Sequence, residues 1–331
     1  MQILDMPGAM WICVAVGMLM HGVLLLRATR SRPGLKRWFG LPLLMPAGFG
    51  IALARLGYFL LQPGEDMSSF DWCFTTGLYG MLAGTAVSAW MTGMPALHLM
   101  DRTAPGFCLA MAAARLGQRW LGEVGFGPWL DEDSWMSRSS LVMRNEWGEP
   151  VAGIFWAEAF TAVLAAMVSL WLLRRMKAWR IPTNVRENPL TGSVAALSVS
   201  LLLIPQIFWE QLRTGYCLYW RMVRAEQVLC VVPVLLALIF LCRAYRREIR
   251  TRVTEAWWPV AAFIVLAGVI VVTEFVLDGK WMSWPEPVSW LVYLSAICAM
   301  IALAGNCTAR LWRERIQAER WYRMTSRWMG E

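Results

Sequence analysis

Residues 257–277 read WWPVAAFIVLAGVIVVTEFVL and contain a single charged residue, Glu274. A run of about 20 apolar residues is long enough to cross the hydrocarbon core of a bilayer as a helix. The whole chain of 331 residues is 58% hydrophobic and only 16% charged, which is too apolar for a soluble protein. The sequence therefore predicts an integral membrane protein.

Eight further stretches have a similar character, and we predict an all-α, polytopic membrane protein with about nine transmembrane helices. In chain order the predicted spans cover residues 8–26, 39–61, 72–91, 105–121, 151–173, 194–212, 228–241, 257–277 and 288–305. The third and fourth are rich in Gly and Ala, which allows close helix packing in lipid. Residues 122–150 form a loop long enough to carry some structure of its own.

The basic residues predict the orientation of these spans. The formal net charge is +8, and Lys and Arg cluster after the first, fifth and seventh spans and in the tail 310–331. Because basic loops stay in the cytoplasm, we expect the N-terminus outside and the C-terminus inside, with the tail against the membrane surface. This distribution accounts for the positive charge, so no nucleic-acid partner is expected.

Metal chemistry has little support in the sequence. The chain contains only two His, and its eight Cys show neither CxxC nor Cys/His spacing. We therefore expect no metal and no other cofactor.

Ionisable residues within or beside a span are costly in lipid and are therefore candidates for function. By the predicted topology, Arg115, Glu123, Glu158, Glu210 and Arg213 lie in or at the outer half of the membrane, where they can converge on one site. Arginines beside carboxylates in an apolar cavity suit an anion, because guanidinium forms bidentate bonds to phosphate. The alternative is that each residue pairs locally with another span and only holds the helices together.

Residues 114–127, ARLGQRWLGEVGFG, resemble the signature G-R-x-G-N-F-x-N-G-E-x-x-G of the prolipoprotein diacylglyceryl transferases. Four residues match directly: Arg115, Gly117, Gly122 and Glu123. Gln118 stands for the first Asn and Leu121 for the second, while Gly127 matches the last Gly if one residue is inserted.

Further segments resemble the same family in the same order. Residues 55–58 (RLGY) resemble R-x-G-Y, and residues 101–105 (DRTAP) resemble D-x-x-A-P. Glu158 corresponds to the Glu of Q-x-Y-E, residues 210–213 (EQLR) to E-F-F-R, and residues 227–233 (QVLCVVP) to G-Q-I-L-x-x-P.

The resemblance implies an enzyme of the bacterial cytoplasmic membrane. Such enzymes move a diacylglyceryl group from phosphatidylglycerol to the lipobox cysteine of a preprolipoprotein and release glycerol phosphate, so an anionic phospholipid, the lipobox segment and membrane lipids are the expected partners. A phosphodiester leaving group needs cationic donors, which Arg55, Arg115 and Arg213 would supply. The attacking thiol must lose its proton, and Glu123 and Glu210 are the candidate bases.

The resemblance also has clear departures. The family motif H-G-G-x-x-G reads YGMLAG at residues 79–84, so that Tyr79 replaces a His, and a phenol is a poor base at neutral pH. Gln206 replaces an Arg four residues before Glu210, which removes a charge. The last two spans have no counterpart in the seven-span family, so we expect a transferase-like domain at 1–253, two added helices at 254–309 and a cytoplasmic tail at 310–331.

Together these considerations predict a catalytic set and a substrate-binding set. The catalytic set is Arg115, Glu123, Glu210 and Tyr79. The substrate-binding set is Arg55, Gln118, Glu158, Gln206, Arg213, Gly80, Gly84 and Gly127.

Three functions are consistent with the sequence. The first is a diacylglyceryl transferase, or a relative with another donor or acceptor. The second is a degenerate homologue that binds lipid or lipoprotein as a membrane partner protein, which the loss of the His and the Arg favours. The third, a transporter, is suggested only by the intramembrane charges and lacks the paired broken helices of many transporters.

Overall fold

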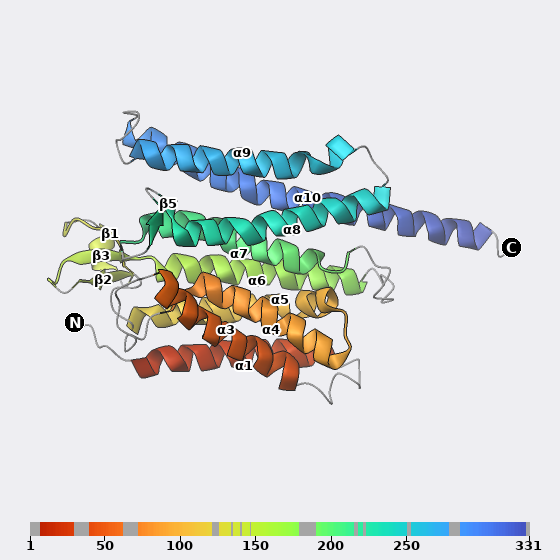
Figure 1. The fold of residues 1–331 in the computed structure, drawn as a ribbon, viewed down its shortest axis with the longest axis horizontal. Helices are drawn as coiled ribbons and strands as arrows, with labels where there is room; N and C mark the ends of the chain where they lie inside the picture. The colour runs from red at the N-terminus through yellow and green to blue at the C-terminus, as the bar shows by residue number, and fades with distance from the viewer. Residues whose placement is uncertain are drawn as a thin grey trace.

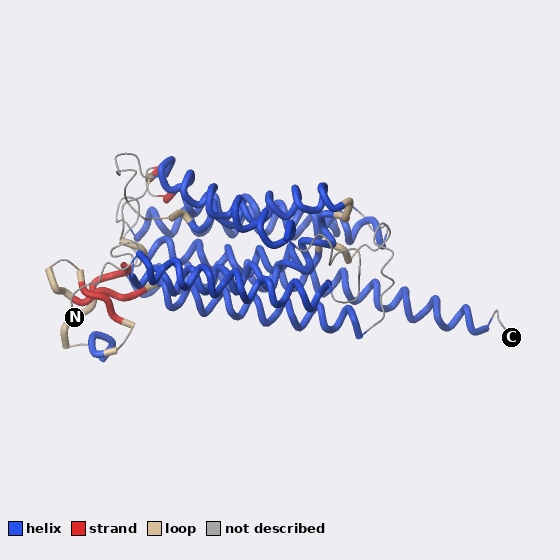
Figure 2. Tube along the Cα trace, turned by 90° about the horizontal axis from the view of Figure 1, so that it is seen from below, coloured by secondary structure: helices blue, strands red, loops and turns tan. Residues whose placement is uncertain are grey.

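The computed structural model describes residues 7–29, 40–61, 72–120, 126–133, 135–139, 141–145, 147–178, 190–214, 218–220, 223–249, 253–277 and 285–328. Most of these residues form long helices that run side by side in an elongated bundle, with short strands at one end (Figures 1 and 2). The predicted helical architecture is thereby confirmed.

Nine α-helices lie within these described residues, and each overlaps one predicted span. They are α1 (Pro7–Thr29), α3 (Gly40–Leu61), α4 (Phe74–Thr92), α5 (Ala96–Gly117), α6 (Phe155–Ala178), α7 (Ser193–Leu212), α8 (Ala225–Ile249), α9 (Val253–Leu277) and α10 (Glu286–Trp328).

Seven of the nine helices are long and apolar enough to cross a membrane. The other two, α4 and α5, lie among them in the bundle (Figure 1). Gly, Ser and Thr lower the hydropathy of α4, while α5 carries Asp101, Arg102 and Arg115. Seven spans therefore follow from length and composition, and the crossing of α4 and α5 stays a prediction.

The junction between α4 and α5 differs from the prediction. Gly93 ends α4 in the left-handed conformation (φ 66°), which glycine adopts without steric cost. Pro95 then occupies the residue before α5 in an extended conformation. Because the turn is this short, α5 begins at Ala96 and not near residue 105.

Successive helices run in opposite directions along the bundle. The first helix, α1, starts at the end that carries the strands, and the last helix, α10, finishes at the other end (Figure 1). Described arginines lie near the C-terminal ends of α1, α6 and α8, as in the pairs Arg174–Arg175 and Arg246–Arg247, and these helices finish at the end of the bundle away from the strands (Figure 1). The grouping of basic residues agrees with the predicted orientation, but which end faces the cytoplasm stays a prediction.

The helix that contains the ninth predicted span extends well beyond the end of that span. The ninth helix does not end near residue 305, because α10 continues without a break to Trp328 (Figure 1). Its last part projects beyond the bundle as a straight extension of the span. The tail contains no Gly or Pro before residue 330 that would interrupt the backbone hydrogen bonds.

The long loop after α5 contains a small antiparallel sheet, which an all-α fold did not include. Its strands are β1 (Phe126–Trp129), β2 (Val142–Arg144) and β3 (Pro150–Gly153), in the order β1-β3-β2. In a separate two-stranded sheet between α7 and α8, β4 (Tyr219–Trp220) pairs with β5 (Val223–Arg224). Short 3-10 helices, η1 (Gln118–Trp120) and η3 (Trp135–Arg138), lie in the same loop. These strands are too short to show a two-residue periodicity in sequence.

The sheet packs onto the helix ends through Phe126, Met143, Val151 and Phe155. The N–H of Thr214, just after α7, donates to the carbonyl of Phe126 at 3.2 Å. The sheet therefore covers the end of the bundle where α5 and α7 finish.

Helix α7 is the centre of the bundle. In its apolar window 78% of the residues are buried, against 28–39% in the other six candidate spans. It contacts α5, α6, α8 and α10. Residues near the end of α7 are therefore enclosed by neighbouring helices.

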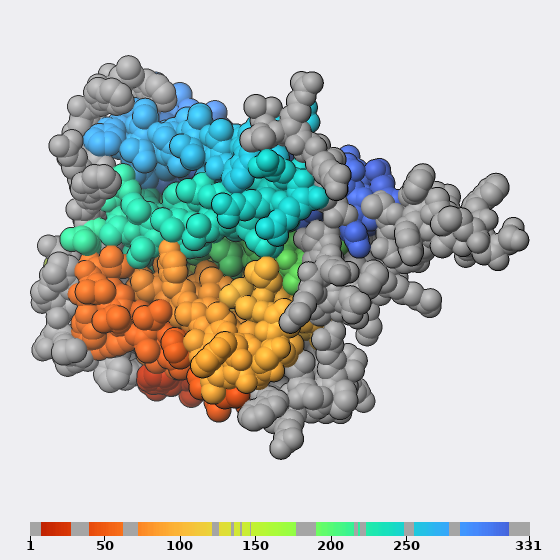
Figure 3. All heavy atoms as spheres, turned by 45° about the vertical axis from the view of Figure 1, so that its right-hand side comes forward, coloured from red at the N-terminus to blue at the C-terminus, as the bar shows by residue number. Residues whose placement is uncertain are grey.

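The outward surface of the bundle is apolar. Leu19, Leu44, Leu60, Val265 and Leu291 are each at least 65% exposed. Figure 3 shows the side chains of the N-terminal helices and of α8 and α9 packed into one continuous body on one face. Large exposed aliphatic side chains over long helices suit contact with lipid acyl chains, as expected for a membrane protein.

Candidate functional site

A cluster of charged side chains lies buried at the end of the bundle next to the sheet. The helices α5 and α7 finish at this end and α6 and α8 begin there, so their terminal residues meet. The cluster contains Arg115 from α5, Glu158 from α6, Glu210 from α7, Arg213 just after α7 and Arg224 from β5.

Glu158 is the centre of this cluster. Its side chain is 1% exposed and forms ion pairs with Arg213 and with Arg115, the latter at 3.3 Å. The amide of Gln206 also donates to Glu158 at 2.7 Å. A buried carboxylate is tolerated in lipid when cations and hydrogen-bond donors surround it, which is the case here.

Glu210 is the second carboxylate and is fully buried. It accepts a hydrogen bond from Gln206 at 2.6 Å, one helical turn away on α7. Arg213 Nε lies 3.4 Å and Arg224 Nη1 3.9 Å from Glu210 Oε2. Arg213 and Gln206 thus each contact both carboxylates.

Arg115 is held from three directions. Besides Glu158, its Nη1 donates to Gln118 Oε1 at 3.3 Å. Its guanidinium lies 4.3 Å from the centre of the Phe74 ring, a cation–π contact. The helix α5 ends and η1 begins between Arg115 and Gln118, which places both side chains on the cluster.

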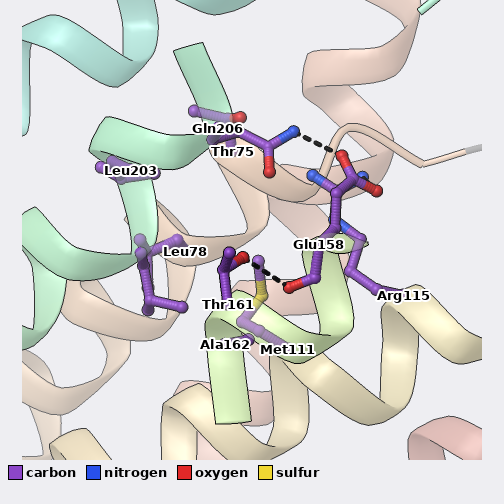
Figure 4. A pocket seen from close by; sticks show the side chains of 10 residues that line it. Thr75, Leu78, Met111, Arg115, Glu158, Thr161, Ala162, Leu203 and Gln206 are labelled. Carbon is purple, nitrogen blue, oxygen red and sulfur yellow. Dashed lines mark hydrogen bonds and ion pairs between the residues drawn. The ribbon is translucent and has the colours of Figure 1, made fainter. Parts of the chain in front are cut away.

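A narrow pocket opens beside the cluster (Figure 4). Arg115, Glu158 and Gln206 form its polar side, and Leu78 and Met111 belong to its apolar side. About 20 Å³ is open to the centre of a water-sized sphere, which is enough for one water molecule. The Arg115–Glu158 ion pair therefore borders a space that can hold a small polar group.

A larger apolar cavity adjoins this pocket. Met111 borders both spaces, and Phe74, which lies under Arg115, lines the apolar one. The cavity lies between α1, α3, α4 and α5 and shares Met18 and Ala47 with a groove between α1 and α3. Two apolar spaces that share lining residues thus lie between the arginine cluster and the exposed side chains of Leu19 and Leu44.

The structure brings together six of the residues that sequence reasoning selected. They are Arg115, Gln118, Glu158, Gln206, Glu210 and Arg213. Glu123 lies outside the described residues.

Other selected residues make contacts elsewhere. Tyr79 donates its hydroxyl to the carbonyl of Leu229 on α8 at 2.8 Å. Arg55 stacks over the ring of Phe59 at 4.7 Å. Gly127 lies on β1, where a Cβ atom would meet Ala152 O at 2.9 Å.

Gly80 and Gly84 lie at the contact between α3 and α4. A Cβ atom at Gly80 would be 2.1 Å from the carbonyl oxygen of Phe49, and one at Gly84 would be 2.5 Å from that of Met45. Helix packing therefore accounts for both glycines, because only the absence of a side chain allows the two backbones to approach this closely.

Asp101 has a structural contact across the bundle. Its carboxylate accepts the N–H groups of Gly192 at 2.6 Å and of Ala195 at 2.8 Å. It therefore caps the start of α7, the helix that carries Gln206 and Glu210.

Arg224 is the functional candidate that sequence reasoning missed. It lies between the sixth and seventh predicted spans, yet only 3% of it is exposed and it reaches Glu210. The available signal was a positive charge four residues before the start of the seventh predicted span. Within the described part of the chain, no group of three or more His, Cys, Asp and Glu side chains is arranged to hold a metal ion.

The fold and the site define a class of protein: a polytopic membrane protein whose helix ends enclose an arginine–carboxylate cluster beside an apolar cavity. A comparison with protein families matches residues 10–243 to the prolipoprotein diacylglyceryl transferases. The chain belongs to this family, as the motifs predicted. The match contains the whole cluster and ends within α8, so α9 and α10 lie beyond it. No curated protein matches the chain.

Proposed function

We propose that this protein transfers a diacylglyceryl group from phosphatidylglycerol to the lipobox cysteine of a preprolipoprotein, in the cytoplasmic membrane of a bacterium. The observation that supports the proposal most is the buried cluster of Arg115, Arg213 and Arg224 around Glu158 and Glu210. It lies within the region that matches the family and beside apolar space that suits a lipid.

The arginines are suited to the phosphate of the donor lipid. A phosphodiester presents two anionic oxygens, as a carboxylate does, so it can replace Glu158 as the partner of Arg115. In a site closed to water such contacts are stronger than at a surface. The adjoining cavity between α1, α3, α4 and α5 would then hold the glyceride and the start of an acyl chain.

The reaction requires one bond to form and one to break. The lipobox sulfur attacks the glycerol carbon that carries the phosphate, and the bond from this carbon to the phosphate oxygen breaks. Glycerol phosphate leaves with the electron pair, and the thiol proton passes to a carboxylate. Arg115, Arg213 and Arg224 stabilise the charge that develops on the leaving group, and Glu210 or Glu123 accepts the proton.

The neutral side chains have supporting roles in this scheme. Gln118 orients Arg115, and Gln206 holds Glu158 and Glu210 apart. We do not assign Tyr79 to proton transfer, because its hydroxyl donates to a backbone carbonyl. Arg55 and Gly127 remain candidates for contact with substrate at the edge of the site.

A second candidate function is lipid or lipoprotein binding without transfer. It is favoured by Gln206, a neutral residue between two carboxylates, at the place where the family has an arginine. A cluster with this arrangement still binds an anionic headgroup but stabilises less charge in the transition state.

An assay with the purified protein in phosphatidylglycerol vesicles separates the two functions. Incubation with a lipobox peptide should add a diacylglyceryl mass to the peptide and release one glycerol phosphate for each peptide. Arg115→Ala should lower the rate at least about 100-fold, since one transition-state contact is worth roughly 2.7–4 kcal/mol.

The matched control is Arg246→Ala, which removes the same charge at the other end of the bundle on α8 and should leave the rate unchanged. Binding of phosphatidylglycerol or of the lipobox peptide to the detergent-solubilised protein that depends on Arg115, without any lipidated peptide, would support the binding function. Neither binding nor transfer by the wild-type protein would contradict both.

A further inference from the structure

Helices α9 and α10 place two polar side chains in an apolar interface. Glu274 on α9 and Tyr293 on α10 are at most 1% exposed, and the Tyr293 hydroxyl donates to Glu274 Oε1 at 2.8 Å. The core around them is formed by residues such as Phe263, Ile270 and Met300. A carboxylate is not needed for such packing and is costly in lipid, so a specific partner must compensate it.

That partner is Gln227 on α8. Its Nε2 donates to Glu274 Oε1 at 2.7 Å and to the carbonyl of Ile207 at 3.2 Å, and the Tyr293 hydroxyl is 3.3 Å away. The sequence alone allows two partners for Glu274, the seven-span core and Lys280, which follows six residues later. Lys280 lies outside the described residues, and the contact with the core is now established.

Gln227 also caps the start of α8. Its Oε1 accepts the backbone N–H of Arg224 at 2.9 Å, three residues earlier. This is half of a capping box, in which the third helical residue binds back to the residue before the helix. Because a backbone N–H can only donate, the amide oxygen must face Arg224, and the amide nitrogen must face Glu274.

The contacts form a continuous path from the added helices to the charged cluster. Glu274 and Tyr293 hold the amide of Gln227, the amide holds the backbone of Arg224, and the guanidinium of Arg224 reaches Glu210. Two of these residues lie outside the family match, which ends at residue 243, and three lie inside it.

We propose that α9 and α10 act as a brace that positions Arg224 for the anionic group of the substrate, with Glu274 and Tyr293 as positioning residues. The proposal rests on the transfer reaction for its role in activity. The brace itself is a property of the folded chain and can be measured without substrate.

The test compares Glu274→Leu with Glu274→Gln in the full-length protein. Leucine removes the acceptor for Gln227, whereas glutamine keeps a carbonyl oxygen in its place. Thr273→Val is the control, because the adjacent Thr273 hydroxyl donates within α9, to Val269 O at 2.8 Å. Hydrogen exchange of the peptide containing the Arg224 amide is measured first, followed by the KM for phosphatidylglycerol and the kcat.

We expect Glu274→Leu to accelerate exchange at Arg224 and to raise KM, each roughly ten-fold, the equivalent of one hydrogen bond to a charged group. Glu274→Gln should restore both values to within about three-fold, and Thr273→Val should change neither. Tyr293→Phe, which keeps the ring and its packing, should give a smaller change in the same direction and replaces Glu274→Leu if that variant does not accumulate.

Two results would overturn the brace. One is unchanged exchange at Arg224 in both Glu274→Leu and Tyr293→Phe. The other is an equal increase in Thr273→Val, since this would reflect general loosening of α9. Accelerated exchange in a protein whose wild type shows no transfer would support the brace and contradict the proposed reaction, so the two failures are distinguishable.

Discussion

The amide nitrogen of Gln206 donates to two carboxylates, Glu158 at 2.7 Å and Glu210 at 2.6 Å. Glu210 lies one turn away on the same helix, whereas Glu158 comes from α6. This neutral side chain thus bridges two buried carboxylates, which would repel each other as anions and which Arg213 also contacts. A substitution at position 206 therefore changes the contacts of both carboxylates at once and tests how they contribute to activity.

Gln206→Arg should increase transfer. A guanidinium can donate to both carboxylates and adds a positive charge beside the leaving phosphate, which we expect to raise kcat about ten-fold, or about 1.4 kcal/mol. Gln206→Leu, which has no donor, should lower both activity and the midpoint of thermal unfolding. If the arginine variant loses activity to the same extent as the leucine variant, position 206 does not act on the substrate. The double variant Gln206→Arg with Tyr79→His should show whether the two family residues act together.

Glu158→Ala should destabilise the fold strongly. It leaves Arg115 and Arg213 without their common partner in a buried site, at a cost of about 3–5 kcal/mol. Denaturation in detergent measures the loss. Thr161→Val, one turn along α6, removes only a hydrogen bond to the Glu158 carbonyl and should cost about 1 kcal/mol. Equal losses in the two variants would show that the ion pairs contribute nothing beyond packing.

Asp101→Ala should loosen the start of α7. The two N–H groups of Gly192 and Ala195 lose their acceptor, which we expect to lower the free energy of unfolding by about 1–2 kcal/mol. Hydrogen exchange should rise at residues 192–196 before it rises elsewhere. Asp131→Ala changes an exposed loop residue and serves as the reference. A uniform increase along the chain would contradict a local capping role.

Gly80→Val should separate α3 from α4. A Cβ atom 2.1 Å from the Phe49 carbonyl cannot be accommodated, so we expect a loss of at least about 2 kcal/mol and poor accumulation in the membrane. Gly48→Ala, where no atom lies within 4 Å of the added Cβ, is the matched control. A stable Gly80→Val protein that fails only to bind phosphatidylglycerol would instead favour the substrate contact predicted from the motif.

The family and the helical architecture were both predictable from sequence. Membrane spans depend on local composition, so a stretch such as 257–277 can be recognised as a span from its own residues. The ordered motifs from Arg55 to Gln227 indicated the family. The small sheet was not predictable, because strands such as β2 (Val142–Arg144) are too short to carry a pattern. The continuous α10 was missed because hydropathy falls where the helix leaves the apolar region, while its hydrogen bonds continue.

The charged cluster also has a part that was predictable from sequence and a part that was not. Composition alone selects Arg115, Glu158 and Glu210, since charge within an apolar segment is a local property. Which arginine meets which glutamate depends on how helix ends from distant parts of the chain pack together. That packing buries Arg224, gives Gln206 two acceptors, and joins Glu274 on α9 to the site through Gln227. The sequence by itself therefore determined the helical membrane fold and most of the charged residues of the site. The tertiary structure decided which of these side chains pair with each other, because those contacts depend on how distant helices pack.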